Sequence, residues 1–351
     1  MRHYIIPIFI PHYGCPHQCV FCDQQSITGV RQWYSEQEIT AIIAEHLARL
    51  RPGRSVEIAF YGGSFTALPA AIQERLLKPA MAVLQQGKAA AIRVSTRPDA
   101  IDTVTIKRLQ LYGVSTVELG VQSLDDYVLE KSERGHSAAE AIAAVALLKS
   151  FQIKCGVQLM PGLPGEDWRS LIHTATQAVA LMPDFVRIYP TVVLAGTKLA
   201  AMFKSGTYQP LSLRAAIVRA AYLKLLFDRQ HIPVIRLGLQ ASEALEAPGT
   251  IIAGPYHPAF GEMVSAFWFG NMVSRFLEEL GPSPRGPLIL RHHPRDHSKL
   301  RGIASANLTH WHQTYPGVAI RPIPDWSQQD EVEIEWQDIR YVVNQAMIFN
   351  C

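Results

Sequence analysis

Before residue 195, short apolar runs alternate with longer segments whose apolar residues recur every three or four positions. The short runs are typical of buried strands, and the periodic segments are typical of amphipathic helices. Strands are expected at residues 4–10, 56–61, 92–95, 117–121, 154–159 and 185–189. Helices are expected at residues 35–51, 69–84, 101–111, 137–150 and 168–181.

Two of the predicted helices begin with a capping box. Ser35 is followed three positions later by Glu38, and Ser137 by Glu140. In this motif the serine hydroxyl accepts a hydrogen bond from the backbone of the glutamate, whose side chain reaches back to the backbone of the serine. The two motifs therefore predict where these helices start.

Strands that alternate with helices predict a parallel sheet with right-handed crossovers. We therefore predict an α/β fold, with a partial (β/α)6 parallel barrel in residues 1–235. A smaller α+β C-terminal extension that contacts the substrate is expected in residues 236–351. Its predicted elements, with the last ones of the barrel, are helices at 213–229 and within 257–280, strands at 234–237, 288–291 and 332–336, and a turn or linker at 281–286.

The composition is that of a globular protein, because 48% of the 351 residues are hydrophobic and 18% are charged. The net charge of +3 permits an anionic partner without requiring one. Pro7 and Pro11 interrupt the first apolar run, so it does not resemble a signal peptide. The longest apolar runs are too short to span a membrane. We expect a cytoplasmic protein without membrane contact, whose five cysteines are reduced.

Residues able to bind ligands or do chemistry follow the ends of the predicted strands. In parallel sheets of this kind, functional groups lie on the loops after the carboxyl ends of the strands. In strand order these loops hold a cysteine-rich segment at 11–22, then Gly62, Gly63 and Ser64, then Arg97, then Gln122 and Ser123, then a Pro/Gly-rich segment at 160–165, and finally Tyr189. Loops that share one rim predict one functional site.

Cys15, Cys19 and Cys22 have a Cys-x3-Cys-x2-Cys spacing on the first loop. Four protein ligands complete a structural zinc site or an ordinary iron–sulfur site. Three thiolates on a [4Fe–4S] cluster leave one iron open to a substrate or cofactor. The other two cysteines, Cys155 and Cys351, are remote in sequence.

Two other interpretations of the cysteine loop stay open. One is a Cys3His zinc site that uses His12, His17 or another histidine as its fourth ligand. The other is a redox-sensing cluster without catalysis. Neither accounts for the remaining rim loops.

With the aromatic residue Phe21 before its last cysteine, the loop resembles the cluster-binding motif of the radical S-adenosylmethionine (SAM) superfamily. Over about residues 4–235 the chain also resembles the radical SAM half of the Elongator catalytic subunit. The segments that carry this resemblance are 61–69, 118–123, 134–136, 160–165 and 188–191.

The resemblance implies a barrel of the radical SAM type, with a [4Fe–4S] cluster on Cys15, Cys19 and Cys22 and SAM as a second cofactor. It implies that an electron from the cluster cleaves SAM reductively and yields a 5′-deoxyadenosyl radical. An electron donor such as flavodoxin or ferredoxin is then an expected partner. The sequence does not indicate the oligomeric state.

The rim loops supply the residues expected to bind SAM: Gly62, Gly63, Ser64, Arg97, Gln122, Ser123, Met160 and Gly162. The candidate catalytic residues are His136, as a proton donor or substrate contact, and Tyr189, on the substrate side. Structural alternatives are a tight turn for the glycine pair, a surface position for Arg97, a helix cap for Ser123 and a purely structural role for His136.

The resemblance implies a radical enzyme that modifies an RNA base, in particular a uridine in a tRNA loop. A C-terminal group of basic residues near Trp311 suits phosphate contact with base stacking: Arg291, His292, His293, Arg295, Lys299 and Arg301. The alternatives are radical oxidation of a small molecule, in the manner of oxygen-independent coproporphyrinogen dehydrogenases, and a non-catalytic Fe–S scaffold. In contrast to the Elongator subunit, the sequence shows neither a recognisable acetyl-CoA loop nor a long basic N-terminal arm.

Overall fold

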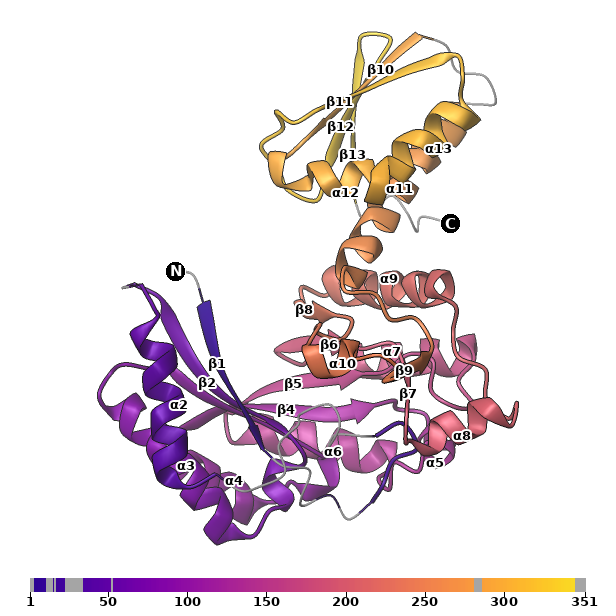
Figure 1. The fold of residues 1–351 in the computed structure, drawn as a ribbon. Helices are drawn as coiled ribbons and strands as arrows, with labels where there is room; N and C mark the ends of the chain where they lie inside the picture. The colour runs from indigo at the N-terminus through magenta and orange to yellow at the C-terminus, as the bar shows by residue number, and fades with distance from the viewer. Residues whose placement is uncertain are drawn as a thin grey trace. The chain divides into compact units, whose positions relative to one another are not determined.

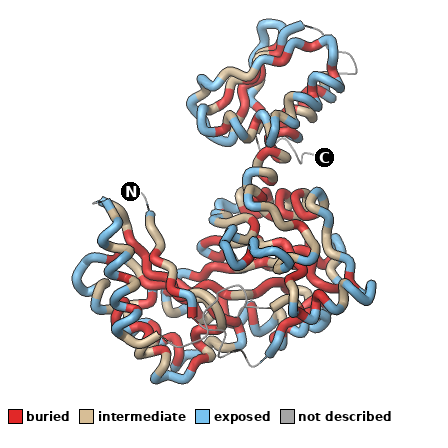
Figure 2. The backbone as a smooth tube through the Cα atoms, in the orientation of Figure 1, coloured by how far each residue is buried: buried red, intermediate tan, exposed pale blue. Residues whose placement is uncertain are grey.

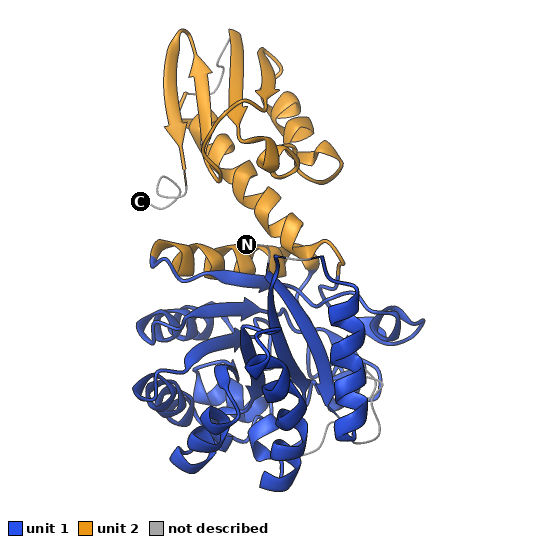
Figure 3. Ribbon diagram, turned by 90° about the vertical axis from the view of Figure 1, so that its left-hand side faces the viewer, with its two compact units in different colours: residues 1–212, 230–256 blue, residues 213–229, 257–351 orange. Residues whose placement is uncertain are grey.

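The structure is a computed structural model that describes residues 3–10, 15, 17–22, 34–51, 53–280 and 286–344. His12, Cys351 and most of the expected turn at 281–286 lie outside the described residues. Figure 3 shows that the chain divides into two compact units, one of residues 1–212 and 230–256 and the other of residues 213–229 and 257–351. The functional boundary expected at residue 235 stays a prediction.

The first unit is built on one seven-stranded sheet in which every neighbouring pair of strands is parallel. In sheet order the strands are β1 (His3–Ile10), β2 (Ser55–Gly62), β3 (Ala91–Thr96), β4 (Val114–Gln122), β5 (Lys154–Leu159), β6 (Phe185–Ile188) and β8 (Val234–Leu237). They curl into a half-barrel (Figure 1). The predicted partial parallel barrel is thereby confirmed, with β8 as a seventh strand.

Helices interleave with these strands and cover the outer face of the sheet (Figure 1). They are α2 (Glu36–Ala48), α3 (Ala70–Gln85), α4 (Thr103–Leu111), α6 (Ala138–Ser150) and α7 (Trp168–Ala180). Alternate side chains of each strand point toward these helices. In β1, for example, Ile6, Ile8 and Ile10 are fully buried. The strands therefore form the buried centre of this unit, as the red segments of Figure 2 show.

Both predicted capping boxes are present. The Ser35 and Ser137 hydroxyls accept hydrogen bonds from the backbone N–H of Glu38 and Glu140, and each glutamate carboxylate accepts one from the backbone N–H of its serine. The sequence analysis did not identify the corresponding pair at α7, where Asp167 is the cap residue. These caps satisfy backbone donors that the first turn leaves without a partner.

The second unit contains a four-stranded sheet with the order β11 (Val318–Ile323), β10 (Gly286–His292), β12 (Val332–Trp336) and β13 (Ile339–Val343). Only the β10–β11 pair is parallel. The helices of this unit are α9 (Leu213–Arg229), α11 (Phe260–Glu279), α12 (His297–Arg301) and α13 (Ala306–Thr314). This mixed architecture confirms the expected α+β extension.

Shorter elements connect the main ones. In the first unit they are α5 (Asp126–Lys131), α8 (Lys198–Lys204), α10 (Glu243–Glu246), the paired strands β7 (Val193–Leu194) and β9 (Ile251–Ala253), and the 3-10 turns Phe65–Ala67 and Pro98–Ala100. In the second unit they are the 3-10 turns Pro294–Asp296 and Ile303–Ser305. Within the described residues, no helix combines the length and the apolar character that a membrane span requires.

Candidate functional site

Val20 fixes the cysteine loop to the rest of the first unit. Its backbone N–H donates to the Ser132 carbonyl at the end of α5, and its carbonyl accepts from the Leu199 N–H in α8. Its side chain is buried in an apolar cluster with Val193 and Tyr208. The loop is thus held on both sides at the position that follows Cys19 directly.

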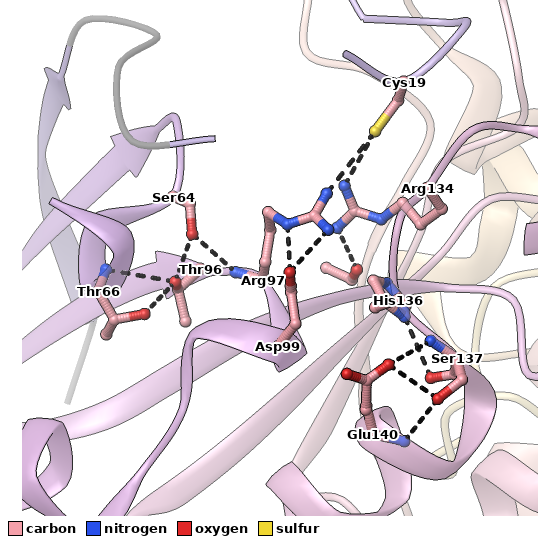
Figure 4. A network of polar contacts seen from close by, with 11 residues as sticks. Cys19, Ser64, Thr66, Thr96, Arg97, Asp99, Arg134, His136, Ser137 and Glu140 are labelled. Carbon is pink, nitrogen blue, oxygen red and sulfur yellow. Dashed lines mark hydrogen bonds and ion pairs between the residues drawn. The ribbon is translucent and has the colours of Figure 1, made fainter. Parts of the chain in front are cut away.

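Two guanidinium groups converge on the buried sulfur of Cys19 (Figure 4). Arg134 Nη1 lies 3.3 Å from this sulfur and Arg97 Nη1 lies 3.9 Å from it. Arg97 is only 2% exposed, so its interpretation as a surface arginine is wrong. Its Nε and Nη2 bind both carboxylate oxygens of Asp99 at 2.9 Å. The planar fork that was expected to hold the SAM carboxylate therefore already binds a carboxylate of the protein.

The same arginines act on Cys15. Burial raises the pKa of the Cys15 thiol, while the charges of Arg97 and Arg134 and a hydrogen bond from the Ser64 backbone oppose that rise. For Arg97, burial lowers the pKa, but Asp99 and the nearby thiols outweigh this effect and raise it. The rim is therefore a place where thiolates and guanidinium groups stabilise each other's charges.

Ser64 links the ends of β2 and β3. It is fully buried, its hydroxyl hydrogen-bonds the Thr96 hydroxyl at 2.9 Å, and it accepts the backbone N–H of Arg97 at 3.2 Å. Gly62 precedes it with a φ of +115°. A Cβ at Gly62 would come closer than 3.0 Å to the carbonyl oxygen of Ile10, the last residue of β1. The packing of β1 against β2 therefore requires this glycine, in addition to any role in binding SAM.

The segment Arg134–Gly135–His136 lies against the cysteine loop along its length. Arg134 binds Cys19, and its Nη2 also donates to the Gly120 carbonyl. A Cβ on Gly135 would overlap the imidazole ring of His17, so only glycine lets the ring approach. The sequence analysis named this segment but did not identify its contacts with the cysteine loop.

His136 is buried beside these arginines. Its Nδ1 lies 3.2 Å from the Ser137 carbonyl, and a carbonyl only accepts, so Nδ1 carries the hydrogen. Its Nε2 is buried and has no hydrogen-bond partner among the described residues. Burial and the charge of Arg134 lower the pKa of His136 to about 4. The ring is therefore neutral at neutral pH and presents a free acceptor; its catalytic role stays a prediction.

Gln122 and Ser123 follow β4 as expected. Gln122 has a φ of +69°, and its side-chain oxygen accepts from the Gln158 amide at 3.2 Å. The Ser123 hydroxyl contacts the Thr174 hydroxyl at 3.0 Å and accepts the Asp125 N–H at 3.2 Å. The interpretation of Ser123 as a helix cap is wrong, because Asp125 caps α5.

Met160 and Gly162 shape the rim after β5. The Met160 N–H donates to the Gln122 carbonyl at 2.9 Å. Gly162 donates its N–H to Glu166 at 2.7 Å, and its carbonyl accepts the Tyr208 hydroxyl at 2.7 Å. Since both polar backbone groups of Gly162 bind the protein, this loop is a rigid wall at the rim.

Charged side chains line the inner face of the sheet, where parallel barrels usually carry branched apolar residues. Glu57 of β2 binds Arg93 of β3 at 2.6 Å, and Arg93 also pairs with Glu118 of β4. Glu118 binds Arg187 of β6 at 2.9 Å. The sequence analysis missed this network, although one charged residue in the middle of an apolar strand was a usable signal.

Tyr189 joins this network at its rim end. Arg187 donates to the hydroxyls of Tyr189 and Tyr61, each at 3.0 Å. Burial raises the pKa of Tyr61 although the charge of Arg187 opposes it. One guanidinium therefore holds both phenol hydroxyls in place; whether Tyr189 faces a substrate stays a prediction.

The expected stacking role of Trp311 is wrong. Its ring is fully buried in the second unit, and its Nε1 donates to the Ser274 hydroxyl at 2.9 Å. A buried indole cannot stack on a base. The signal that suggested it, an aromatic residue close to basic residues in sequence, does not distinguish a core position from a surface position.

The basic residues around Trp311 differ in their availability. Arg291 pairs with Asp325 and lies within 3.6 Å of Glu333 and Glu335, and Lys299 binds Asp296 and Asp330. His292 is fully buried and hydrogen-bonds His297 at 2.9 Å. His293 is half-buried, whereas Arg295 and Arg301 are exposed. Only these last two suit contact with a phosphate.

The described part of the chain contains no three His, Cys, Asp or Glu side chains arranged to hold a metal ion. This applies to the cysteine loop and to the histidine-rich segment of the second unit. The fit of the cysteine loop to an iron–sulfur cluster therefore depends on its donor set and on the surrounding charges. Cys155 is fully buried in β5, and burial raises the pKa of its thiol to about 12.

Comparison with known families agrees with this fold and this arrangement of cysteines. Residues 9–178 match the radical SAM superfamily, and residues 183–267 match the radical SAM C-terminal domain. The chain belongs to the radical SAM superfamily of enzymes.

Individual relatives carry more specific names. The chain is 29% identical over 265 residues to the tRNA uridine(34) acetyltransferase of Methanocaldococcus jannaschii, covering 64% of this chain and 49% of the relative. It is 27% identical over 261 residues to Elongator complex protein 3 of Saccharomyces cerevisiae, covering 61% and 46%. The chain thus spans about half the length of these curated relatives.

A solved structure matches over nearly the whole chain. It is the Elp3 protein of the archaeon Methanocaldococcus infernus with an N-terminal deletion. The TM-score is 0.58 at 21% identity, with 97% of this chain and 77% of that chain covered. At this level of identity the match shows that the fold is shared.

Proposed function

We propose that this enzyme cleaves SAM reductively at a [4Fe–4S] cluster and uses the resulting 5′-deoxyadenosyl radical to modify a uridine base of tRNA. The observation that carries the proposal is the cysteine loop at the strand ends, where Arg97 and Arg134 converge on the buried sulfur of Cys19. Superfamily membership and the names of the relatives support it.

Cys15, Cys19 and Cys22 would hold the cluster, which when bound supplies the electron for cleavage of SAM. The donor set fits, because three thiolates accumulate negative charge that the two arginines offset. The loop offers no fourth cysteine, which leaves one iron for the amino and carboxylate groups of SAM. A protein such as flavodoxin or ferredoxin would deliver the electron.

The proposed SAM site lies on the adjoining rim. Ser64 and Arg97 order the ends of β2 and β3 next to the cluster, and the Gly62–Gly63 turn leaves space beside them. The free acceptor of His136, its buried Nε2, suits a hydroxyl or amino donor of a ligand. Gln122, Ser123, Met160 and Gly162 would complete the walls, and water would be excluded by the buried surroundings.

A tRNA base suits a barrel site for a physical reason. A base in a single-stranded loop leaves its stack at low cost, whereas a paired base does not. Arg295 and Arg301 are exposed for phosphate contact. With a net charge of +3 and few available cations, binding should be modest and should weaken steeply with salt.

The first test concerns the cluster. Replacement of Cys15, Cys19 or Cys22 by Ala should abolish the cluster absorbance and the formation of 5′-deoxyadenosine after anaerobic reconstitution. The matched control is Cys155→Ala, because this buried thiol lies in β5 and should not ligate iron. A triple variant of the loop cysteines with full iron and sulfide content contradicts the proposal.

The second test concerns the substrate. Binding of tRNA across a salt series should weaken in an Arg295→Ala/Arg301→Ala variant, with a loss of about one unit of log–log slope per phosphate contact. The control variant Lys88→Ala/Lys107→Ala removes the same charge from exposed positions of the first unit. Nucleosides from a deletion strain, compared by mass spectrometry, should lack one uridine modification. No binding at low salt together with unchanged nucleosides favours the small-molecule alternative.

A further inference from the structure

Arg134 and Arg97 differ in how their charges are balanced. Arg97 is paired with Asp99 through two hydrogen bonds. Arg134 is also buried, yet no carboxylate of the described residues forms an ion pair with it. Its Nη2 binds the neutral carbonyl of Gly120, and its Nη1 points at the Cys19 sulfur (Figure 4).

A buried guanidinium without an anion is unfavourable, so the fold must place a negative charge beside it. The only anionic partner that Arg134 contacts among the described residues is the Cys19 thiolate, at 3.3 Å. We propose that Arg134 is a positioning residue that donates an N–H···S hydrogen bond to cluster ligand Cys19 and raises the reduction potential of the cluster. The inference rests on the cluster of the proposed function.

The direction of the effect follows from charge. With three thiolate ligands, a [4Fe–4S] cluster carries one net negative charge when oxidised and two when reduced. A fixed cation and a hydrogen bond to sulfur stabilise the more negative form more strongly, and both are known determinants of cluster potential. Gly120 and Gly135, which flank Arg134 in space and in sequence, leave no room for it to turn away without losing its carbonyl contact.

The experiment measures the midpoint potential of the reconstituted protein without SAM, by redox titration followed by electron paramagnetic resonance of the reduced cluster. Arg134→Met should make the reduced cluster about tenfold less populated at a given potential, a shift of about 59 mV to lower values for one electron. Arg134→Lys keeps the charge but loses the planar fork, and should fall between the two. The control Arg108→Met removes a half-buried arginine that contacts only Gln73.

A measurement on the unaltered sequence covers the case in which the variants lose the cluster. In protein labelled with ¹⁵N-arginine, pulsed paramagnetic resonance of the reduced cluster should show a ¹⁵N coupling. Absence of that coupling, or a midpoint in Arg134→Met equal to that of Arg108→Met, overturns the inference. An unchanged midpoint with weakened SAM binding also overturns it and assigns Arg134 to the SAM carboxylate. Protein that never assembles a cluster contradicts the proposed function itself.

Discussion

Replacement of Gly62 by Ala should destabilise the first unit far more than replacement of a surface glycine with a similar backbone. Gly62 has a φ of +115°, which costs a residue with a Cβ about 1–3 kcal/mol. The added methyl also presses on the Ile10 carbonyl, which belongs to a paired strand and cannot move freely. Such overpacking costs a further ~1–3 kcal/mol. The expected loss is therefore about 4 kcal/mol.

Gly87→Ala is the matched control, since Gly87 has a φ of +68° and a methyl group added there would meet nothing within 4 Å. That variant carries the backbone strain alone, about 1–2 kcal/mol. Urea unfolding of cluster-free protein gives both free energies, and calorimetry should show Gly62→Ala melting about 5–10 °C below the control. Equal stability of the two variants would refute the claim that the β1–β2 contact requires a glycine.

Three further outcomes are expected. Ser137→Ala removes one capping box and should cost about 1 kcal/mol in urea unfolding, whereas Ala138→Ser on the next residue should cost less. Glu118→Gln leaves Arg93 and Arg187 short of a carboxylate and should cost about 3–5 kcal/mol; a loss below about 1 kcal/mol contradicts the buried network. Burial and then Arg134 lower the pKa of His136 from 6.5 to about 4. Because the folded-state pKa lies below the unfolded one, the neutral ring contributes stability above pH 6.5 that is lost as the pH falls toward 4, about 3 kcal/mol in total. Unfolding free energies of cluster-free protein at pH 7 and pH 4.5 should therefore differ less in His136→Gln than in the unaltered protein, and an equal difference contradicts the assignment.

Much of the barrel was predictable because its strands are buried on both faces and read as continuous apolar runs. The run at 154–159 coincides with β5, and the periodic segment at 213–229 coincides with α9. The elements that were missed have little local signal. β7 and β9 contain two and three residues, and β11 includes a proline that weakens its strand pattern.

The candidate site was predictable only where its residues are neighbours in the chain. The cysteine spacing is a local pattern, so the loop could be identified from sequence. The contact between Arg134 and Cys19 joins positions 115 residues apart, and no local pattern encodes it. Trp311 was misassigned because burial of a single aromatic residue in a short helix depends on the packing of the whole second unit.

The charges inside the half-barrel have a consequence for how the sheet assembles. Along neighbouring strands their sign alternates, from Glu57 to Arg93 to Glu118, and after β5 comes Arg187. A strand shifted by one residue would turn its charge into the helix layer, and exchanged neighbours would place like charges side by side. Apolar runs of similar length can pair in many ways, whereas this sequence of signs permits one order and one register. We infer that the network selects the correct strand arrangement during folding.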